Sequence, residues 1–339
     1  FKNNHRILNK MNGLINLGNT CYMNSIIQCI SHLNIFDTSN ETFIKDYQKV
    51  LHKNDTELME QWLKLQKNLI TLNVDKRINP IEFYKSFIIN LKKDGYYFVG
   101  FDQNDAGEFM TILFNLLHKC LQYRINISIN GQTKNARDKI AVNSIQSWSR
   151  FFKNEYSYII KSTYSQLLSI TNCPQCNYNT YNHDPIQIIT LHMKQGLKTL
   201  YDLLSDFTRM EILDNDNTWK CDECNQRVNP EKKNIFWNLS DILIFQIKRY
   251  NNNLTKNNEH IKFPLLLKMN RFSMNYNEVS SEFELCAMSI QMGSLNGGHY
   301  IAICKDGDQW NVYNDTSVFK IELDELLQRS PYCLFYKRI

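Results

Sequence analysis

The sequence lacks the features of membrane and secreted proteins. No apolar run reaches the roughly 20 residues that a membrane-spanning helix needs. The N-terminal segment shows no basic stretch followed by an apolar one and a small-residue cleavage site. We therefore expect an intracellular protein of the cytoplasm or the nucleus. The chain begins at Phe1 and not at a methionine, which suggests a piece of a longer protein.

Cysteine is too sparse for a disulfide-stabilised scaffold. Ten cysteines in 339 residues fall far below the roughly 8–10% of small secreted frameworks, which favours reduced thiols, some of them bound to metal. An excess of one charge is also missing, because 39 basic and 34 acidic residues are spread along the chain without a lysine-rich tail or an arginine stripe. The composition therefore gives little support to nucleic-acid binding.

The residue pattern changes from helical to strand-like along the chain. Apolar residues at helical spacing follow Cys21, Asn79 and Asp105, which predicts that the first 125 or so residues are mainly helical. Beyond about residue 155, β-branched and aromatic runs predict strands at 156–170, 186–192, 234–250, 283–291, 300–304 and 333–337. Only 199–207 and 322–328 are helical there, and 251–260 is a polar loop. This order predicts an α+β fold in which a helical lobe packs against a sheet-rich one.

Cys21 is the best candidate for a nucleophile. It lies in the first turn of a predicted helix, after a cap at Asn19 or Thr20. A helix N-terminus favours the thiolate over the thiol. A buried structural cysteine is the ordinary alternative. The preceding loop favours the nucleophile, because the Asn16 amide and the Gly18 N–H can surround a developing oxyanion.

His299 is the best candidate for a general base. It follows Gly297 and Gly298 at a glycine-rich turn that leads into a strand. Any other histidine, taken alone, is a surface or packing residue. Further along the chain Asn314 and Asp315 follow a short aromatic strand, and an amide or carboxylate there can accept the other imidazole N–H. The same pair is also an ordinary turn sequence.

Two Cys-x-x-Cys pairs predict a metal site. Cys173 and Cys176 form the first pair, and Cys221 and Cys224 form the second. Four thiolates at this spacing predict a tetrahedral, structural zinc ion, with no position left for a catalytic water. A thioredoxin-like redox pair would instead need one such pair at a strand-to-helix junction. A zinc-ribbon nucleic-acid protein explains these pairs alone, and it requires strongly salt-dependent binding of DNA or RNA.

Four segments resemble the signature boxes of ubiquitin-specific proteases. GLINLGNTCYMNSIIQCI at 13–30 resembles the cysteine box of that family, and GGHYIAICKDGDQWNVYNDTSV at 297–318 resembles the histidine box. QNDAGEF at 103–109 is similar to the glutamine-aspartate box, and LIFQIKRY at 243–250 is similar to the central strand that ends in Lys-Arg-aromatic. The matching segments extend from Gly13 to Tyr336, which is nearly the whole chain.

The resemblance implies a papain-like cysteine protease fold and mechanism. It implies one catalytic domain over 1–339, with a helical thumb (about 1–125), zinc-ribbon β fingers (about 155–240) and a β-rich palm (about 126–154 and 241–339). Cys21 would be the nucleophile, His299 the base and Asn16 the oxyanion donor. Asn314 would orient the imidazole, with Asp315 as a supporting carboxylate. The zinc site would pin the tip of the fingers.

The resemblance also implies a deubiquitinase that cuts after the C-terminal Gly-Gly of ubiquitin. Its substrates would be ubiquitinated proteins or polyubiquitin, with or without a recruiting or activating protein, and with no membrane or nucleic acid. Asp105 and Glu108 would meet the arginine-bearing ubiquitin tail, although both also suit a helix start. We expect Gly297, Gly298 and Tyr300 to contact the same tail.

An inactive, ubiquitin-binding scaffold with the same fold is the alternative function. It would bind ubiquitin without hydrolysis, and the intact set of catalytic residues argues against it. Two positions depart from the family pattern. Gln291 stands where the family usually has a histidine, and Asn104 replaces the second glutamine of the glutamine-aspartate box. Neither change removes a catalytic group, but both concern the loops over the ubiquitin tail.

Overall fold

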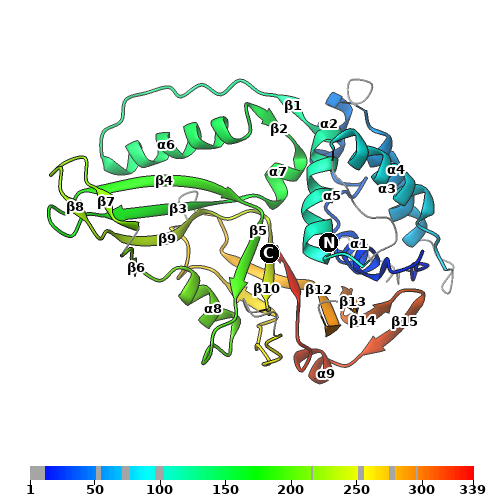
Figure 1. Cartoon of the computed structure of the whole chain (residues 1–339). Coiled ribbons are helices and arrows are strands. Elements are labelled where there is room, and N and C mark those ends of the chain that lie inside the picture. The colour runs from blue at the N-terminus through cyan, green and yellow to red at the C-terminus, as the bar shows by residue number, and fades with distance from the viewer. Residues whose placement is uncertain are drawn as a thin grey trace, which may run out of the picture.

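The computed structural model describes residues 12–50, 55–70, 77–95, 103–214, 217–250, 256–274, 279–294 and 297–339. Figure 1 shows a helical lobe on one side, a large sheet beside it, and an extended second sheet that projects away from the helices. The predicted α+β organisation is confirmed. Within the described ranges, no helix has the length and apolar character needed to cross a membrane.

The helices of the described residues lie mostly in the first half of the chain. They are α1 (Cys21–His32), α2 (Glu41–Val50), α3 (Glu57–Leu69), α4 (Ile81–Lys93), α5 (Ala106–Leu121), α6 (Ala136–Phe151), α7 (Tyr158–Thr163), α8 (Leu200–Phe207) and α9 (Leu323–Leu327). The helices predicted after Asn79 and Asp105 and at 199–207 and 322–328 are confirmed as α4, α5, α8 and α9.

The strands form two principal sheets. They are β1 (Tyr123–Arg124), β2 (Glu155–Tyr156), β3 (Ser165–Asn172), β4 (Asn179–Ile186), β5 (Ile188–His192), β6 (Glu211–Ile212), β7 (Trp219–Lys220), β8 (Arg227–Val228), β9 (Glu231–Asn238), β10 (Ile242–Lys248), β11 (Leu266–Lys268), β12 (Glu282–Ser294), β13 (Gly297–Asp306), β14 (Gln309–Asn314), β15 (Ser317–Ile321) and β16 (Cys333–Arg338). An eight-stranded sheet has the order β15-β14-β13-β12-β16-β10-β5, with β11 paired to β12, and a four-stranded sheet has the order β4-β3-β9-β6.

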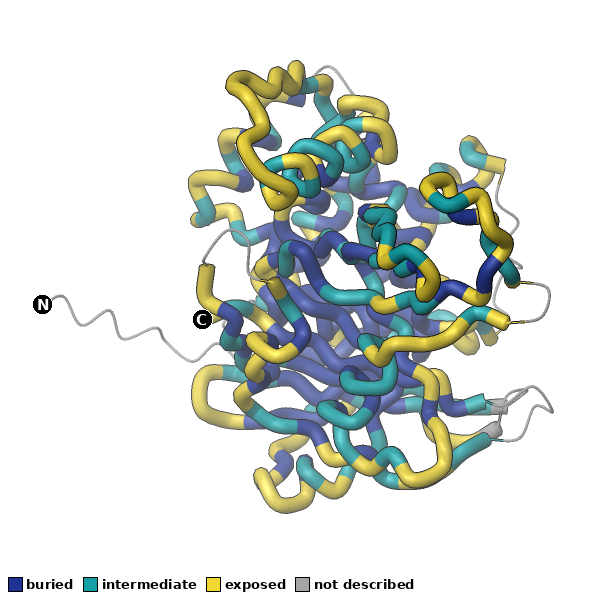
Figure 2. The backbone as a smooth tube through the Cα atoms, turned by 90° about the vertical axis from the view of Figure 1, so that its left-hand side faces the viewer, coloured by how far each residue is buried: buried dark blue, intermediate teal, exposed yellow. Residues whose placement is uncertain are grey.

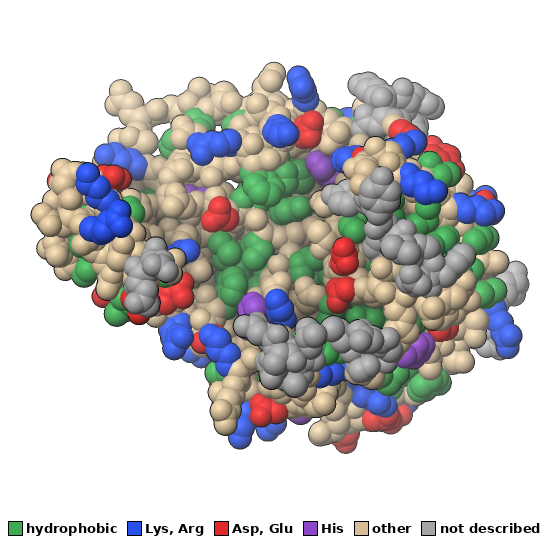
Figure 3. Space-filling view, viewed as in Figure 1, with side chains coloured by type: hydrophobic (Ala, Val, Ile, Leu, Met, Phe, Trp, Pro, Cys, Tyr) green, Lys and Arg blue, Asp and Glu red, His purple; other side chains and the backbone are tan. Residues whose placement is uncertain are grey.

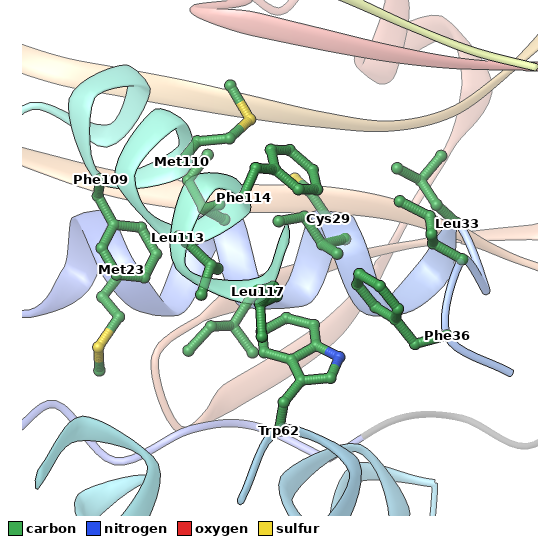
Figure 4. Packing of buried hydrophobic residues seen from close by; sticks show 14 of the residues in the cluster. Met23, Cys29, Leu33, Phe36, Trp62, Phe109, Met110, Leu113, Phe114 and Leu117 are labelled. Carbon is green, nitrogen blue, oxygen red and sulfur yellow. The ribbon is translucent and has the colours of Figure 1, made fainter. Parts of the chain in front are cut away.

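Helix α1 lies between the two lobes. All of its residues are buried, because one side packs on β12 and β13 and the other on α5. Figure 4 shows Met23 of α1 near Phe109 of the facing helix and Cys29 of α1 near Phe114. Figure 2 shows that the buried backbone is concentrated in the interior strands, with exposed loops around them. This packing fixes α1 against the strand that carries His299.

Two predictions of secondary structure are wrong in part. The strand predicted at 156–170 is instead the helix α7 followed by β3, because Ser157 caps α7 by accepting from the Ile160 N–H at 3.4 Å. The apolar side chains of Ile159 and Ile160 are buried, so the β-branched run fills a helix interface. The strand predicted at 234–250 is divided into β9 and β10. Part of the predicted loop, residues 251–255, lies outside the described residues.

Helix α6 was not expected from the sequence. Only Ser144 of this helix is buried, so it has no apolar stripe that would mark it. It lies along β4, where the Asn143 side chain donates to the Tyr181 carbonyl at 2.9 Å and the Ser147 hydroxyl donates to the His183 carbonyl at 2.8 Å. Polar contacts to a strand backbone, rather than apolar burial, hold this helix.

Candidate active site

The loop before α1 is shaped by two left-handed residues. Gly18 has φ 105° and Asn19 has φ 52°, and the α1 cap that follows is Thr20. The Asn16 carbonyl oxygen Oδ1 accepts hydrogen bonds from the backbone N–H groups of Gly18 and Thr20, each at 3.0 Å. This turn places Cys21 at the first position of the helix, as the sequence predicts.

The Cys21 thiol meets the strand that carries His299. The N–H of Tyr300, the next residue, donates to the Cys21 sulfur. Cys21 is 3% exposed, and this burial raises the pKa of its thiol above the usual value. The Tyr300 hydrogen bond lowers it, and the nearby Asp315 carboxylate raises it. The N–H groups of Cys21 and Tyr22 at the helix start lower the pKa as predicted, but burial raises it by more.

His299 and Asn314 form the hydrogen bond that the sequence predicts. His299 lies on β13 and Asn314 ends the adjacent strand β14, and the imidazole Nε2 is 2.6 Å from the Asn314 Oδ1. Because an amide oxygen only accepts, Nε2 is the donor in this bond, and Nδ1 is the ring nitrogen that Asn314 does not use. The structure therefore places an imidazole, oriented by Asn314, on the hairpin that contacts Cys21.

The Asp315 side chain bonds to the loop before α1, which carries Asn16, and not to the His299 imidazole. Its carboxylate accepts from the Asn16 amide at 2.9 Å and from the Asn24 amide at 2.8 Å. Its backbone carbonyl accepts from the Leu14 N–H at 2.8 Å. We expected Asp315 to support the imidazole, whereas in the structure it orients Asn16. An amide nitrogen carries two hydrogens, so Asn16 retains one for an oxyanion.

Asp315→Ala is expected to lower kcat by roughly 100-fold, the usual effect of losing an oxyanion donor, with little change in KM. Alkylation of Cys21 by iodoacetamide needs no oxyanion donor, and the lost carboxylate no longer raises the pKa of the thiol, so alkylation is expected to be at least as fast in the variant. The exposed Asp308 in the β13–β14 turn provides a matched control in Asp308→Ala. If alkylation slows as much as turnover does, Asp315 acts on the thiol and not on the oxyanion site.

The glycines before His299 are held by a glutamine from the opposite lobe. The Gln103 side chain donates to the Gly298 carbonyl at 2.8 Å and accepts from the Gly298 N–H at 3.0 Å. Gly297 pairs with Ser294 in the β12–β13 ladder. The Tyr300 ring packs edge-on against Tyr332 with centroids 5.6 Å apart. The sequence contains Gln103 in a family box, but its paired contact with Gly298 was not predicted.

Asp105 and Glu108 differ in what their carboxylates contact. Asp105 caps α5 by accepting from the N–H groups of Gly107 at 2.8 Å and Glu108 at 3.0 Å, and it also accepts from the Tyr332 hydroxyl. Glu108 is exposed in the first turn, with no partner among the residues that the structure describes. Asp105 therefore caps α5 while it remains exposed, and Glu108 is a second exposed carboxylate beside it.

Both acids border a groove of about 750 Å³ between α5, α6, β4 and β5. Its lining includes the apolar side chains of Phe151, Ile186 and Ile188. Figure 3 shows hydrophobic side chains gathered in the hollow between the helical lobe and the projecting sheet, with acidic side chains at its margin. The groove offers an apolar floor and negative charge to a globular, basic-tailed ligand.

Glu108→Gln is expected to raise KM for a ubiquitin substrate by roughly 3- to 10-fold, because a partly exposed charge pair is lost. The effect should shrink as salt is added, since screening weakens such a pair. Glu82→Gln provides the control, because Glu82 is also exposed in a first helical turn but pairs with Lys85. An unchanged KM for Glu108→Gln at low salt would show that this carboxylate does not face the tail.

The two departures from the family pattern form contacts of their own. Lys256 donates to the carbonyl oxygens of Gln291 and Gly293, each at 3.0 Å, and also to the Gln291 side chain. Gln291 pairs with Tyr300 in the β12–β13 ladder. Asn104 donates to the Tyr22 hydroxyl at 3.3 Å. Gln291 therefore ties a segment near residue 256 to the strand beside the histidine.

The four predicted metal ligands come together at the end of the projecting sheet. Their sulfur atoms all lie within 4.8 Å of one another, with Cys173–Cys224 at 3.8 Å and Cys176–Cys221 at 3.6 Å. A tetrahedron with metal–sulfur bonds of about 2.3 Å has edges of about 3.8 Å, whereas a disulfide requires about 2.05 Å. The residues therefore fit a tetrahedral metal ion.

The two Cys-x-x-Cys turns have the same backbone form. In each, an asparagine with positive φ follows the second cysteine, and its N–H donates to the carbonyl of the first cysteine at 2.9 Å. These asparagines are Asn177 and Asn225. Backbone N–H groups of Gln175 and Cys176 also point at the Cys173 sulfur. Such donors orient and stabilise thiolate ligands, so both turns are prepared for a metal.

Comparison with known proteins gives consistent matches. The ubiquitin carboxyl-terminal hydrolase family model matches residues 12–336. The chain is 29% identical to ubiquitin carboxyl-terminal hydrolase Usp2 of Drosophila melanogaster, over 96% of this chain and 34% of the relative. It is 30% identical to human ubiquitin carboxyl-terminal hydrolase 2, over 96% of this chain and 54% of the relative. The chain thus spans only part of the length of these curated relatives.

Solved structures show the same fold. The SAGA DUB module of Ubp8, Sgf11, Sus1 and Sgf73 bound to monoubiquitin gives a TM-score of 0.73 at 28% identity, covering 97% of this chain and 69% of that chain. The same module bound to ubiquitin aldehyde gives a TM-score of 0.71 at 26% identity, covering 97% and 70%. The predicted ubiquitin-specific protease fold is therefore confirmed.

Proposed function

Because this chain belongs to the ubiquitin carboxyl-terminal hydrolase family, we propose that it is a deubiquitinase domain that acts through Cys21. The reaction is thiol-dependent hydrolysis of the peptide or isopeptide bond after the C-terminal Gly-Gly of ubiquitin. The observation that carries the proposal is the His299–Asn314 hydrogen bond of 2.6 Å, on the strand whose next N–H meets the Cys21 sulfur. These contacts join nucleophile, base and orienting amide in one place.

We infer a role for each group in the first half of the reaction. The free Nδ1 of His299 takes the Cys21 proton, and the thiolate attacks the carbonyl carbon of the terminal glycine. The negative charge on the carbonyl oxygen is stabilised by the remaining Asn16 N–H. The imidazolium, held by Asn314, then gives its proton to the departing amine, which leaves a thioester on Cys21.

Water completes the reaction. His299 removes a proton from a water molecule, which attacks the thioester carbonyl. The Cys21 thiolate leaves and is reprotonated, so ubiquitin departs with a free carboxylate. Because Cys21 is only 3% exposed, the site favours a substrate whose cleaved residues have no side chains, as in Gly-Gly.

We assign the body of ubiquitin to the groove bordered by Glu108. In this assignment residues of about 1–125 form the thumb, about 155–240 the fingers, and about 126–154 with 241–339 the palm. Glu108 meets the basic tail, and Gly297, Gly298 and Tyr300 line its path to the sulfur. The Ubp8 structures, which contain ubiquitin and three further proteins, support ubiquitin as the substrate and a protein complex as the working context.

We propose zinc as the metal of the four-cysteine site. Cys173, Cys176, Cys221 and Cys224 would hold it, and it would join the β3–β4 turn to the β7–β8 turn. Zinc supplies a fixed tetrahedral link there and no catalytic chemistry, because all four positions are taken by thiolates. No disulfide joins any of the ten cysteines, all of which lie in the described part of the chain, and this fits a reducing intracellular compartment.

Hydrolysis of a fluorogenic ubiquitin C-terminal amide tests the proposal. The wild-type chain is expected to release the fluorophore, and Cys21→Ala is expected to abolish release while still binding ubiquitin. Cys29→Ala, which alters a buried thiol of the same helix, is the control and should retain turnover. Ubiquitin binding without hydrolysis by the folded wild-type chain would instead establish the inactive scaffold.

A further inference from the structure

Helix α1 has a second anchor at the end opposite Cys21. Its last residue, His32, has a side chain that is 2% exposed. The imidazole Nδ1 lies 2.7 Å from the Gln28 carbonyl oxygen, and Nε2 lies 2.9 Å from the Asp306 Oδ1. Asp306 is the last residue of β13. The nucleophile's helix is therefore joined to the far end of the strand that carries the base.

The contacts of His32 satisfy both of its ring nitrogens. Nδ1 is bonded to the Gln28 carbonyl, and Nε2 is bonded to the Asp306 carboxylate and lies 3.2 Å from the Tyr313 hydroxyl. The other oxygen of Asp306 accepts from the Tyr313 hydroxyl at 2.7 Å and from the Asn311 amide at 2.6 Å. Burial acts to raise the pKa of Asp306, but the bonds from His32, Tyr313 and Asn311 together lower it. His32 and Asp306 thus form a buried hydrogen-bonded pair.

His32 also contacts β14, the strand that carries Asn314. Its ring packs against Tyr313 with centroids 5.0 Å apart, and Tyr313 directly precedes Asn314 on β14. The Asp306 carboxylate joins the two strands because Asp306 is on β13 and its partners Asn311 and Tyr313 are on β14. One buried cluster thus contacts the helix of Cys21, the strand of His299 and the strand of Asn314.

We propose that His32 and Asp306 are positioning residues that fix α1 along β13, and so hold the Cys21 sulfur at the distance from His299 that proton transfer requires. The proposal rests on the proposed thiol chemistry of Cys21 and His299. Neither His32 nor Asp306 reaches the substrate. They act through the placement of the helix.

The dimensions of the two elements show why the far anchor matters. From residue 21 to residue 32 a helix advances about 16 Å at ~1.5 Å per residue, and from residue 300 to residue 306 a strand advances about 20 Å at ~3.3 Å per residue. The two anchors thus lie at similar separations, about 16 Å along the helix and about 20 Å along the strand. A tilt of about 4° about the His32 end would move Cys21 by about 1 Å at this helix length, and 1 Å of misplacement can cost roughly 100-fold in rate.

The pH profile of Cys21 alkylation tests this role without ubiquitin. The experiment measures iodoacetamide addition to the Cys21 peptide by mass spectrometry. It compares the wild-type protein with the variants His32→Leu, His32→Gln and His299→Ala. His32→Leu is expected to lose roughly 10-fold or more of the rate near neutral pH and to approach the His299→Ala profile, since thiol and imidazole are no longer in register. His32→Gln retains one donor and is expected to recover part of the rate.

Controls separate positioning from stability and from the proposed function. His183 is a buried histidine of β4 whose ring nitrogens have no partner among the described residues, so His183→Leu should change the melting temperature but leave the Cys21 profile intact. With a ubiquitin substrate, His32→Leu should lower kcat and leave KM within about 2-fold. If His32→Leu does not fold, Asp306→Asn replaces it with the same expectation.

A His32→Leu or Asp306→Asn profile that coincides with the wild type, despite a lower melting temperature, would overturn the positioning role. Failure of the wild type to hydrolyse ubiquitin would reject the proposed function instead. It would leave the alkylation comparison as the deciding result for His32 and Asp306, because that comparison depends only on the Cys21–His299 register.

Discussion

His299→Ala is expected to reduce kcat by roughly 100- to 10,000-fold, the range that a positioned general base contributes. KM should change little, because His299 is bound to Asn314 and is not assigned to the groove. The rate of ubiquitin hydrolysis at saturating substrate measures the effect. His192→Ala, at an exposed histidine that ends β5, is the control. A His299→Ala variant with more than a tenth of wild-type kcat would place the base elsewhere.

His299→Ala is also expected to change how the alkylation of Cys21 depends on pH. Burial raises the pKa of the Cys21 thiol, so the neutral thiol is favoured when no imidazolium stands beside it. Without His299, thiolate should form only at a pH above that of an ordinary cysteine, and alkylation should move to the alkaline side. In the wild type the imidazole accepts the proton, and alkylation should extend to lower pH. Identical profiles for the two proteins would mean that His299 and Cys21 are not coupled.

Cys224→Ser is expected to cause the largest loss of stability. Structural zinc contributes about 10–16 kcal/mol of apparent binding free energy in small zinc-finger peptides, and a serine hydroxyl is a poor replacement for a thiolate. The variant should retain less than half an equivalent of zinc by elemental analysis, and the melting temperature should fall. A chelator should have the same effect on the wild type. Cys21 alkylation in the remaining folded protein should be preserved, because the metal site is structural.

Cys286→Ser is the matched control for the metal site. Cys286 is half-buried like Cys224, but it lies on β12 and outside the four-cysteine cluster. The Cys286→Ser variant should retain its zinc and lose little stability. If Cys224→Ser binds metal and melts as Cys286→Ser does, the four sulfur atoms do not hold a structural ion.

Local patterns predicted the nucleophile's helix and the metal ligands well. Cys21 begins α1 because a left-handed turn and a polar cap precede an apolar helical stripe, and all of this information lies within a few neighbouring residues. The same holds for the Cys-x-x-Cys turns, whose two halves share one local form. The sequence also predicts that the two turns come together, because two Cys-x-x-Cys pairs, beginning at Cys173 and Cys221, are typical of a four-thiolate metal site.

Predictions from the sequence failed where tertiary packing overrode the local secondary-structure preference of the residues. Residues Tyr158 to Ile160 have strand-like side chains, yet they form α7 because Ser157 caps the helix and α5 covers it. Helix α6 has no apolar stripe and is held by polar contacts to β4. Secondary-structure propensity and hydrophobic periodicity do not report such contacts, because the contacts of α6 and α7 depend on the residues across the interface.

Contacts between residues far apart in the chain could not be predicted from the sequence either. Asp315 bonds to Asn16 and not to His299, because its left-handed backbone (φ 50°) turns the side chain toward the oxyanion loop. The His32–Asp306 pair joins two segments that no motif connects. The raised pKa of Cys21 follows from burial, which a helix start does not reveal. Each of these features depends on how α1 lies on the sheet.

The most direct test of the account is a covalent one. The chain is incubated under reducing conditions with ubiquitin that carries a C-terminal electrophile, and the adduct is located by intact mass and peptide mapping. The account predicts one ubiquitin per chain, attached through Cys21, with the addition slowed in His299→Ala and in His32→Leu. A folded chain that forms no adduct, or one attached through any of its other nine cysteines, would contradict it.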